Sequence, residues 1–473
     1  MAAVHLQAAL LCSSLLYGLL CGLLCGLHPG LLRSAHADES PPHPDLSRPL
    51  SLADCLRLAD TSAVPVLAAR ARRLDADAGV AQAATLPNPS FSYVAQDLGL
   101  TTAAGPLLLH QAMIGLAPGT ALLRIQESRA ARLARTGAEA TVASERRTLR
   151  LAVGLAFYDL GFLHRLADVE QRALRLTAAY VAQAQLRQAH GDASGLDTQR
   201  AQAEHIDAQR QAESTNQERL RSELWFSIAL GAERPQPLQL IFNPDVSNDV
   251  SNDVSSNVSN DVSKDWAAGA SAALAGLPPR PESLTADHAE RLLDDLFRLA
   301  REHRPELRQA MADAEQALAL GRLAVLRALP LSDAQLALGL RQSAVGTSGV
   351  LAVSGSLPLW DFAGGPRLRA QAQGLAARAR MLDHERQIRL ELATALHDLQ
   401  TLRTQRRQHA LPLRELRSQI LKTVRLQFAE GVVPFFDVVQ AHRDLLAAER
   451  ALAAVERDAQ KARFRLVAAI AAW

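Results

Sequence analysis

Cysteine is nearly absent from this chain of 473 residues, which contains only four. Three of them, Cys12, Cys21 and Cys25, lie close to the N-terminus, so Cys55 is the only one in the rest of the chain. A single thiol excludes an internal disulfide and a cysteine-based metal centre. Aromatic residues make up only 4%, whereas alanine, leucine, arginine and glutamine are abundant, a mixture typical of long helices rather than a β-sandwich. The net charge of +2 gives no sign of nucleic-acid binding.

Long hydrophobic runs are also missing beyond the N-terminal segment Leu6–Leu27. That run is followed by Ser34-Ala35-His36-Ala37, which matches a signal-peptidase cleavage pattern, so we interpret residues 1–37 as a secretory signal peptide. A membrane anchor is the alternative, because no lysine or arginine precedes the run. Each cysteine in this segment follows a leucine, which argues against lipid attachment. With no later apolar run of sufficient length for a transmembrane helix, a membrane protein would have to be a β-barrel or peripheral.

Motifs for catalysis and for cofactor binding are missing as well. The sequence has no glycine-rich phosphate loop, no nucleophile elbow and no HExxH motif. His384, His397 and His409 are separated by 13 and 12 residues, not by the three or four that place two metal ligands on one helix face. We therefore predict no enzyme, no cofactor and no metal site.

What the sequence does contain is an internal duplication. Four pairs of residues recur in the same order at a spacing of 240: Pro65 and Pro305, Pro118 and Pro358, Gly191 and Gly431, Asp197 and Asp437. A period of this length indicates two copies of one plan rather than a solenoid. We assign residues 38–242 to the first copy and residues 281–473 to the second.

Residues 243–280 separate the two copies. Asn243–Trp266 is a low-complexity tract of Asp, Asn, Ser and Val, which we interpret as a surface insert or linker. Its aspartates raise the alternative of a calcium site, but the tract lacks the glycine and the terminal glutamate of a calcium loop.

Each copy begins with a predicted helix, Leu52–Ala84 or Leu292–Ala328. Alternating segments then predict two strands in each copy, listed here in chain order: Ser90–Gln96, Leu107–Ala117, Gln335–Arg341 and Ser348–Trp360, the last following a Gly-Thr-Ser-Gly turn. These lengths are close to the ~9–11 residues with which a tilted strand crosses a bilayer.

After its strands each copy is predicted to be helical for more than a hundred residues. Apolar residues repeat in steps of four and three, as in Leu149, Val153, Ala156, Leu160 and Leu163, a pattern typical of coiled coils. Turns at Gly191–Gly195 and Gly431–Pro434 divide these segments into antiparallel hairpins with the turns as their tips. Pro412 has no counterpart in the first copy, and it predicts a helix break there.

Four strands cannot close a membrane barrel, since the smallest have about eight. Open strand edges are not tolerated in lipid, so a chain with four membrane strands must associate. We predict a mostly α-helical fold in which three copies share a twelve-stranded β-barrel, with the helices forming a tube beside it.

At this level the chain resembles the TolC-type outer-membrane efflux protein family, over nearly all of the mature sequence except the insert. The resemblance is carried by the duplicated order and by four segments: residues 51–92, RPELRQAMADAEQALALGRLAVLRALP, SLPLWDFAGGPRLRAQAQ and EGVVPFFDVVQAHRDLLAAER. LPNPSFS followed by AQDLG is most similar to outer-membrane subunits of cobalt-zinc-cadmium type (RND) efflux systems.

The resemblance implies a homotrimeric outer-membrane channel with a periplasmic helical tunnel. Its tips would dock on a periplasmic adaptor protein of a tripartite pump driven by an inner-membrane transporter, and it would pass substrates outward passively, with metal cations favoured over drugs. Two alternatives stay open: the exit duct of a type I protein-secretion system, and a periplasmic coiled-coil scaffold or adaptor that never enters the membrane.

The resemblance also points to pore and gate residues near the tips. Asp437 and Asp197 each begin a tip helix, and threefold symmetry would place Asp437 in an acidic ring. Capping of the helix N-terminus is the alternative role for both. Gln440 stands where some family members carry a second aspartate, and Val433 stands where some carry a basic residue.

Candidate adaptor contacts are the residues of the two turns: Gly191, Gly195, Leu196, Gly431, Val432, Val433 and Pro434. Exposed apolar residues at a tip favour a partner, whereas the glycines are equally explained by turn geometry. Pro118, Pro358 and Trp360 mark the corners between strands and helices. Trp360 fits either an aromatic belt at the membrane surface or buried packing.

Overall fold

A computed structural model of the chain describes residues 48–102, 105–118, 120–191, 194–242, 286–329, 332–343, 346–355 and 362–470. All of them belong to one unit, residues 44–473, which is distinct from residues 1–43. The predicted signal peptide, the insert 243–280, Pro358 and Trp360 lie outside the described residues.

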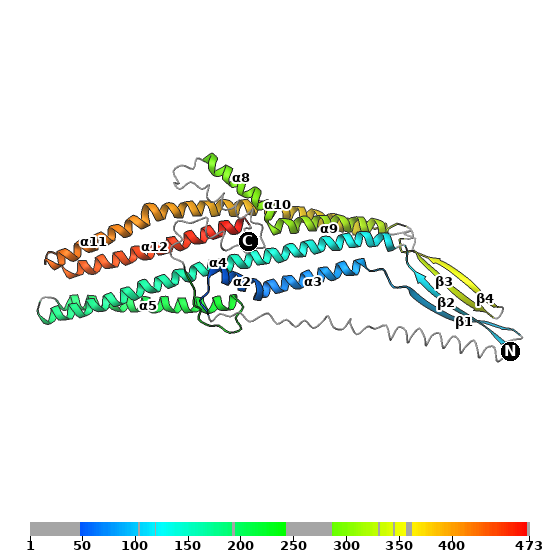
Figure 1. Ribbon diagram of the computed structural model, residues 1–473, viewed down its shortest axis with the longest axis horizontal. Coiled ribbons are helices and arrows are strands. Elements are labelled where there is room, and N and C mark those ends of the chain that lie inside the picture. Colours follow the sequence, from blue (N-terminus) through cyan, green and yellow to red (C-terminus); the bar gives the residue numbers. More distant parts are fainter. Residues whose placement is uncertain are drawn as a thin grey trace. The chain divides into compact units, whose positions relative to one another are not determined.

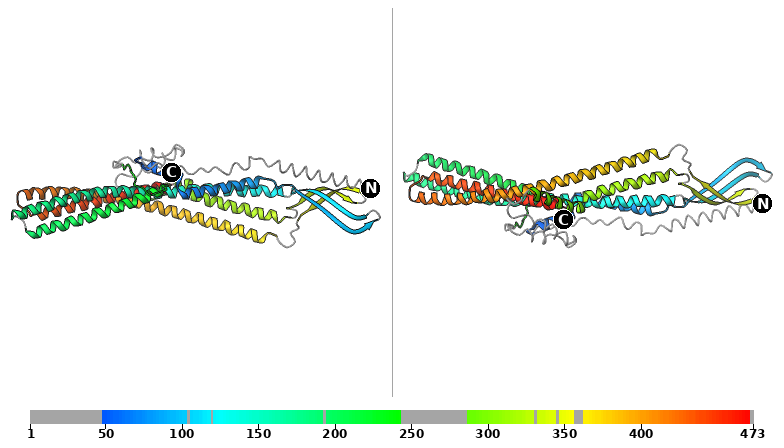
Figure 2. Two further views of the ribbon diagram at one scale, coloured as in Figure 1. Left: turned by 90° about the horizontal axis from the view of Figure 1, so that it is seen from below. Right: turned by 90° about the horizontal axis from the view of Figure 1, so that it is seen from above.

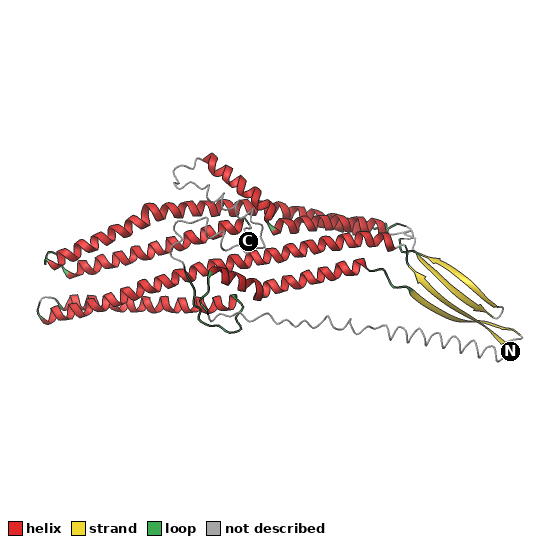
Figure 3. Ribbon diagram, viewed as in Figure 1, coloured by secondary structure: helices red, strands yellow, loops and turns green. Residues whose placement is uncertain are grey.

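The duplicated order of elements is confirmed (Figures 1 and 3). The first copy consists of α2 (Leu52–Ser62), α3 (Val64–Ala84), β1 (Ser90–Thr102), β2 (Gly105–Leu116), α4 (Thr120–Ala189) and α5 (Gly195–Ala229). The second consists of α8 (Ala286–His303), α9 (Pro305–Arg327), β3 (Gln335–Ser343), β4 (Gly346–Ser354), α10 (Gly364–Thr404), α11 (Leu411–Ala429) and α12 (Phe435–Ala469), with a π-helical turn, Gln405–Ala410, joining α10 to α11. None of the described helices is long and apolar enough to cross a membrane.

The prediction of one helix before each strand pair is wrong, because two helices occupy each of these segments. Ala63 (φ −73°, ψ 130°) and Arg304 (φ −67°, ψ 120°) are extended and separate α2 from α3 and α8 from α9. The new helices carry Pro65 and Pro305 in their first turns. A proline has no N–H to donate to the preceding turn, so it is tolerated at the start of a helix and not in its interior.

The strands form a single antiparallel sheet in the order β1-β2-β3-β4, so the two copies meet where β2 pairs with β3. The register places Ile114 opposite Leu338, and Leu338 opposite Leu351. The predicted Gly-Thr-Ser-Gly turn is wrong, because Gly346–Gly349 already belongs to β4. Gly346, the first residue of β4, has a φ of 145°, which suits only glycine. β4 ends at Ser354, and the remainder of the predicted strand is outside the described residues apart from Gly355.

The helices pack side by side in two groups that share α4 (Figure 2). Next to the sheet, the contacts run α3–α4–α9–α10. Toward the turns they run α5–α4–α12–α11. With 70 residues at ~1.5 Å each, α4 is about 105 Å long and belongs to both groups.

Two buried clusters hold the helices together where the groups meet. One joins α2, α4 and α5 through residues such as Cys55, Phe157 and Phe226. The other joins α8, α9, α10 and α12 through residues such as Leu392 and Leu466. The short helices α2 and α8 thus supply corresponding parts of the core in the two copies.

The predicted break at Pro412 is also wrong. Ala410 and Leu411 keep helical dihedral angles, and the helix continues through the π-helical turn Gln405–Ala410 into α11. A proline ring clashes with the carbonyl group four residues earlier, and the wider π turn contains that residue, Gln408. The helix therefore accommodates the proline by widening.

Candidate functional site

One face of the sheet carries many exposed, large apolar side chains, with His110, Gln342 and Thr347 in one row across it. Because side chains alternate along a strand, the register places nine of the apolar side chains on the same face: Phe91, Tyr93, Ile114, Leu116, Leu336, Leu338, Leu340, Leu351 and Val353. Their exposed fractions run from 37% to 66%. A contiguous apolar surface of this kind indicates a lipid or protein partner.

The opposite face of the same sheet is mostly small or polar. It carries Ser90, Ser92, Gln96, Gln111, Gly115, Gln335, Ala337, Gly339, Arg341, Ser348, Ala352 and Ser354, with Val94, Leu109, Met113 and Val350 as the apolar members. Apolar residues on one face and polar residues on the other are typical of membrane strands that separate lipid from a water-filled lumen.

At the first tip, Gly191 has φ 83° and its N–H donates to the carbonyl of Gln188 at 3.1 Å. The next helix is capped reciprocally: the Ser194 hydroxyl accepts from the backbone N–H of Asp197 at 3.2 Å, and the Asp197 carboxylate accepts from the N–H of Ser194 at 3.2 Å. The capping role of Asp197 is therefore confirmed.

The second tip has the same turn without the cap. Gly431 has φ 76°, and the N–H of Val432 donates to the carbonyl of Gln427 at 2.9 Å. Pro434 caps α12 without a side-chain hydrogen bond. The Asp437 carboxylate is exposed, and within the described residues no hydrogen bond or ion pair reaches it. Asp437 is thus not engaged in a side-chain cap, whereas Asp197 is.

Most of the remaining predicted tip and corner residues that the structure describes are exposed. Leu196 and Val432 are 54% and 68% exposed, Val433 is half-buried, and Gly195 is the first residue of α5. Gln440 is exposed and donates to Asp444 at 3.1 Å. Pro118 is exposed in the turn between β2 and α4, where its carbonyl accepts from the N–H of Ala121 at 3.1 Å.

The two phenylalanines of the second tip pack against the first hairpin. Phe435 meets Tyr180 of α4 edge-on, with ring centroids 5.2 Å apart. The guanidinium of Arg200, on α5, lies 5.5 Å from the centroid of the Phe436 ring. Likewise Arg187, on α4, lies 5.2 Å from the centroid of the Phe428 ring. The two tips are therefore joined by aromatic and cation–π contacts.

A buried polar cluster lies close behind these aromatic contacts. The Tyr180 hydroxyl is hydrogen-bonded to Nδ1 of His442, and the Arg425 guanidinium lies 2.5 Å from Nε2 of the same ring. Burial, with the Arg425 charge as a smaller contribution, lowers the pKa of His442 to about 4. Burial also raises the pKa of Tyr180. The histidine is therefore neutral at physiological pH.

A ladder of ion pairs continues from this cluster along α4 and α12. Glu170 is fully buried and accepts from Arg450 at 2.7 and 2.8 Å. The other rungs are Arg172–Glu449 at 3.0 Å, Arg165–Glu456 at 3.1 Å and Asp159–Lys461 at 2.8 Å. Ion pairs thus join the two hairpins along much of their length, beside the apolar contacts.

No metal-binding arrangement accompanies these groups. Across the described part of the chain, no group of three or more His, Cys, Asp or Glu side chains could hold a metal ion.

The geometry matches that of solved outer-membrane proteins. The outer membrane protein VceC of Vibrio cholerae superposes with a TM-score of 0.65 at 17% identity, covering 89% of this chain and 96% of that one. The CmeC outer membrane channel of Campylobacter jejuni gives 0.66 at 11% identity, covering 89% and 85%. The MtrE outer membrane channel of Neisseria gonorrhoeae gives 0.66 at 16% identity, covering 89% and 88%. The chain has the TolC-type fold.

No protein-family model matches the sequence, and no curated protein matches it. Within this fold, the sequence indicated the turns and the capping aspartate, because glycine and acid positions recur in both copies. It did not indicate the Tyr180–His442–Arg425 cluster, whose members lie on three helices and occur in one copy only.

Proposed function

We propose that this chain is one subunit of a homotrimeric outer-membrane channel that conducts substrates passively to the exterior. The two-faced sheet carries the proposal, because its apolar face suits lipid and its polar face suits an aqueous lumen. The strands contain 13, 12, 9 and 9 residues, enough to cross a bilayer.

The sheet edges support the proposal of a trimer. Within the described residues, the outer edges of β1 and β4 have no partner strand. Pairing β1 of one copy with β4 of the next would satisfy both edges in lipid, and three copies would form a barrel of twelve strands. The helices of the three copies would then enclose a periplasmic tunnel, with six hairpin tips facing a periplasmic adaptor and its inner-membrane transporter.

Metal cations are our preferred cargo, with drugs as the second choice. This preference comes from the resemblance of the LPNPSFS region to cobalt-zinc-cadmium type systems. The free Asp437 carboxylate agrees with it, because a ring of three such groups would attract cations.

Single-channel conductance in a planar bilayer tests the channel itself. The purified full-length chain should run as a heat-modifiable trimer, be found in the outer-membrane fraction and give discrete conductance steps. A protein that inserts into the bilayer and never conducts would refute the channel. A protein that stays in the periplasm would instead support the scaffold alternative.

The cargo needs a separate experiment. A deletion strain should lose tolerance to cobalt, zinc or cadmium and regain it when the gene is restored. Loss of tolerance to antibiotics alone would indicate a drug pump, and loss of a secreted protein from the medium would indicate a type I secretion duct.

A further inference from the structure

The helices are strongly basic where they approach the sheet. The helical segments 78–84 of α3, 120–134 of α4, 316–327 of α9 and 364–380 of α10 lie toward the strands, and Glu127 is the single acid among them. The next acids along these helices are Asp75 and Asp77 of α3 and Asp313 and Glu315 of α9. The four segments include the arginines that we call the arginine band: Arg124, Arg129, Arg132, Arg322, Arg327, Arg367, Arg369, Arg378 and Arg380. The described loop between α9 and β3 adds one further acid, Asp333.

Most of this charge is not compensated within the chain. Glu127 accepts from Arg327 at 2.7 Å and pairs with Arg124 at 3.3 Å, while Arg380 pairs with Asp313 at 3.0 Å. In the described part of the chain no hydrogen bond or ion pair reaches the guanidinium groups of the other six, which are all exposed: Arg129, Arg132, Arg322, Arg367, Arg369 and Arg378. The charged ladder between α4 and α12, in contrast, is paired.

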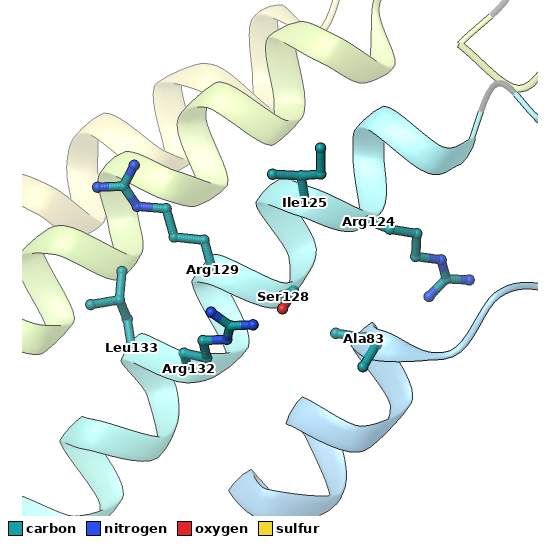
Figure 4. Close-up of a pocket in the computed structure, with 8 residues that line it drawn as sticks. Ala83, Arg124, Ile125, Ser128, Arg129, Arg132 and Leu133 are labelled. Carbon is teal, nitrogen blue, oxygen red and sulfur yellow. The ribbon is translucent and has the colours of Figure 1, made fainter.

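Three members of the band line a pocket of about 620 Å³ beside α3 (Figure 4). Arg124, Arg129 and Arg132 share it with apolar side chains, among them Ile125 and Leu133. Guanidinium groups beside apolar side chains suit a ligand that combines a phosphate group with a hydrocarbon body.

The sheet-side end of the band lies at the depth of lipid headgroups. α4 begins at Thr120, shortly after Leu116, which is on the apolar face of the sheet. At ~1.5 Å per residue, Arg124 to Arg132 lie about 6 to 18 Å along the helix from its start. The headgroup layer adds roughly 5 to 8 Å on each side of the hydrocarbon core, and screening at physiological salt extends over ~8 Å. The band therefore begins within the field of the membrane surface.

A second copy of the chain would bring little negative charge to the band, since Asp75 is the one acid of α3 that has no partner among the described residues. Neighbouring copies would meet through α3 and α10, the outer helices of this group. α10 contributes only arginines to the band, and the nearest acid on α3, Asp77, already pairs with Arg135 at 2.9 Å.

We infer that the arginine band binds the phosphate groups of anionic lipids at the helix side of the membrane, with the pocket of Arg124, Arg129 and Arg132 as its strongest site. This inference rests on the membrane location in the proposed function. Clusters of basic residues next to a membrane-spanning segment bind anionic lipid through such charge pairing.

Lipid titration of the full-length protein in a neutral detergent tests it, with phosphatidylglycerol as the anionic probe and phosphatidylcholine as the zwitterionic one. The double variant R129Q/R132Q should bind phosphatidylglycerol about tenfold more weakly and phosphatidylcholine unchanged. The control R175Q/R221Q removes two exposed arginines far from the sheet that likewise have no partner among the described residues, and it should bind both lipids like the wild type.

Unchanged phosphatidylglycerol binding by R129Q/R132Q would overturn the inference. So would a double variant whose conductance changes ion selectivity while its lipid binding does not, because the arginines would then line the lumen. A wild type that conducts but prefers neither lipid refutes the arginine band alone. A wild type that forms no trimer and no conductance refutes the proposed channel.

Discussion

Gly154 has no space for a side chain, because a Cβ atom there would lie 2.0 Å from the Phe464 ring. This contact brings α4 of the first copy against α12 of the second. We predict that Gly154→Ala destabilises the protein by about 1–3 kcal/mol through overpacking. Gly79→Ala is the control: nothing lies within 4 Å of the added atom, and alanine in a helix should stabilise by about 0.5–1 kcal/mol. Thermal unfolding of both variants measures the difference, and equal midpoints would contradict it.

The two tip aspartates should respond differently to removal of their charge. Asp437 has no partner among the described residues, whereas Asp197 is bonded to Ser194. We predict that Asp437→Asn lowers the cation selectivity of the conducting trimer, measured as a shift in reversal potential across a salt gradient. Asp197→Asn should leave selectivity unchanged and cost about 0.5–1 kcal/mol of stability as the cap weakens. Unchanged cation selectivity in Asp437→Asn would show that the Asp437 carboxylate does not face the lumen.

At the residue level, the sequence predicts what local geometry dictates. Gly191 in the first copy and Gly431 in the second both have positive φ, and a turn of this kind favours glycine whatever surrounds it. The burial of His442 depends instead on Tyr180 and Arg425, which approach from other helices. Nothing within a few residues of His442 signals that environment.

At the level of elements, His442 links α4, α11 and α12, and it should make their packing sensitive to pH. The pKa of His442 is about 4 in the folded protein and about 6.5 in the absence of such an environment. Between these two pH values the unfolded chain binds more protons than the folded protein. The free energy of unfolding therefore falls as the pH decreases from about 6.5 to about 4, and the contribution of His442 stays constant below about pH 4. The loss should reach about 3 kcal/mol.

His442→Gln retains a hydrogen-bonding side chain and cannot titrate, so it should lose this part of the pH dependence. His409→Gln, an exposed histidine in the π-helical turn, is the control and should behave like the wild type. Thermal midpoints measured across this pH range compare the three proteins. A His442→Gln variant with the full wild-type dependence would assign the effect to other groups.

The helix breaks show how far an element can be predicted. Pro65 and Pro305 are visible in the sequence at equivalent positions, yet apolar spacing alone joins the residues on either side of them into one helix. At Pro412 the error runs the other way, because neighbouring helices hold the chain in a helical path through a π turn. Low helix propensity marks each proline as a site where a helix is disturbed. Tertiary packing then determines whether the helix ends there or continues in a distorted form.

For the whole molecule, the two faces of the sheet should tolerate charge differently. Leu338 is 60% exposed on the apolar face, whereas Ser92 is on the polar face at nearly the same depth, since it pairs with Met113 and Met113 pairs with Gly339. Arginine facing lipid near mid-bilayer costs about 2–4 kcal/mol. We predict that Leu338→Arg reduces the trimer in the outer-membrane fraction and that Ser92→Arg assembles normally. Equal assembly of the two variants would show that the apolar face does not contact lipid.

The architecture was predictable because strand alternation and the 240-residue repeat are global patterns in the sequence. Alternation assigns a face to each residue, and Leu336, Leu338 and Leu340 lie on the predicted shared face. The lateral order of the helices, in which α4 contacts both α9 and α12, was not predictable. That order depends on which apolar stripes meet, and many stripes in this chain are alike.

The π-helical turn makes the two duplicated hairpins mechanically unequal. In the first copy α4 is one uninterrupted helix of 70 residues, which should resist bending along its whole length. In the second copy the corresponding helix is interrupted by the π-helical turn Gln405–Ala410, where the regular α-helical hydrogen bonds are lost. Bending of the protein should therefore concentrate at the π-helical turn. Amide hydrogens in this turn should exchange faster than those at the same distance from the start of α4.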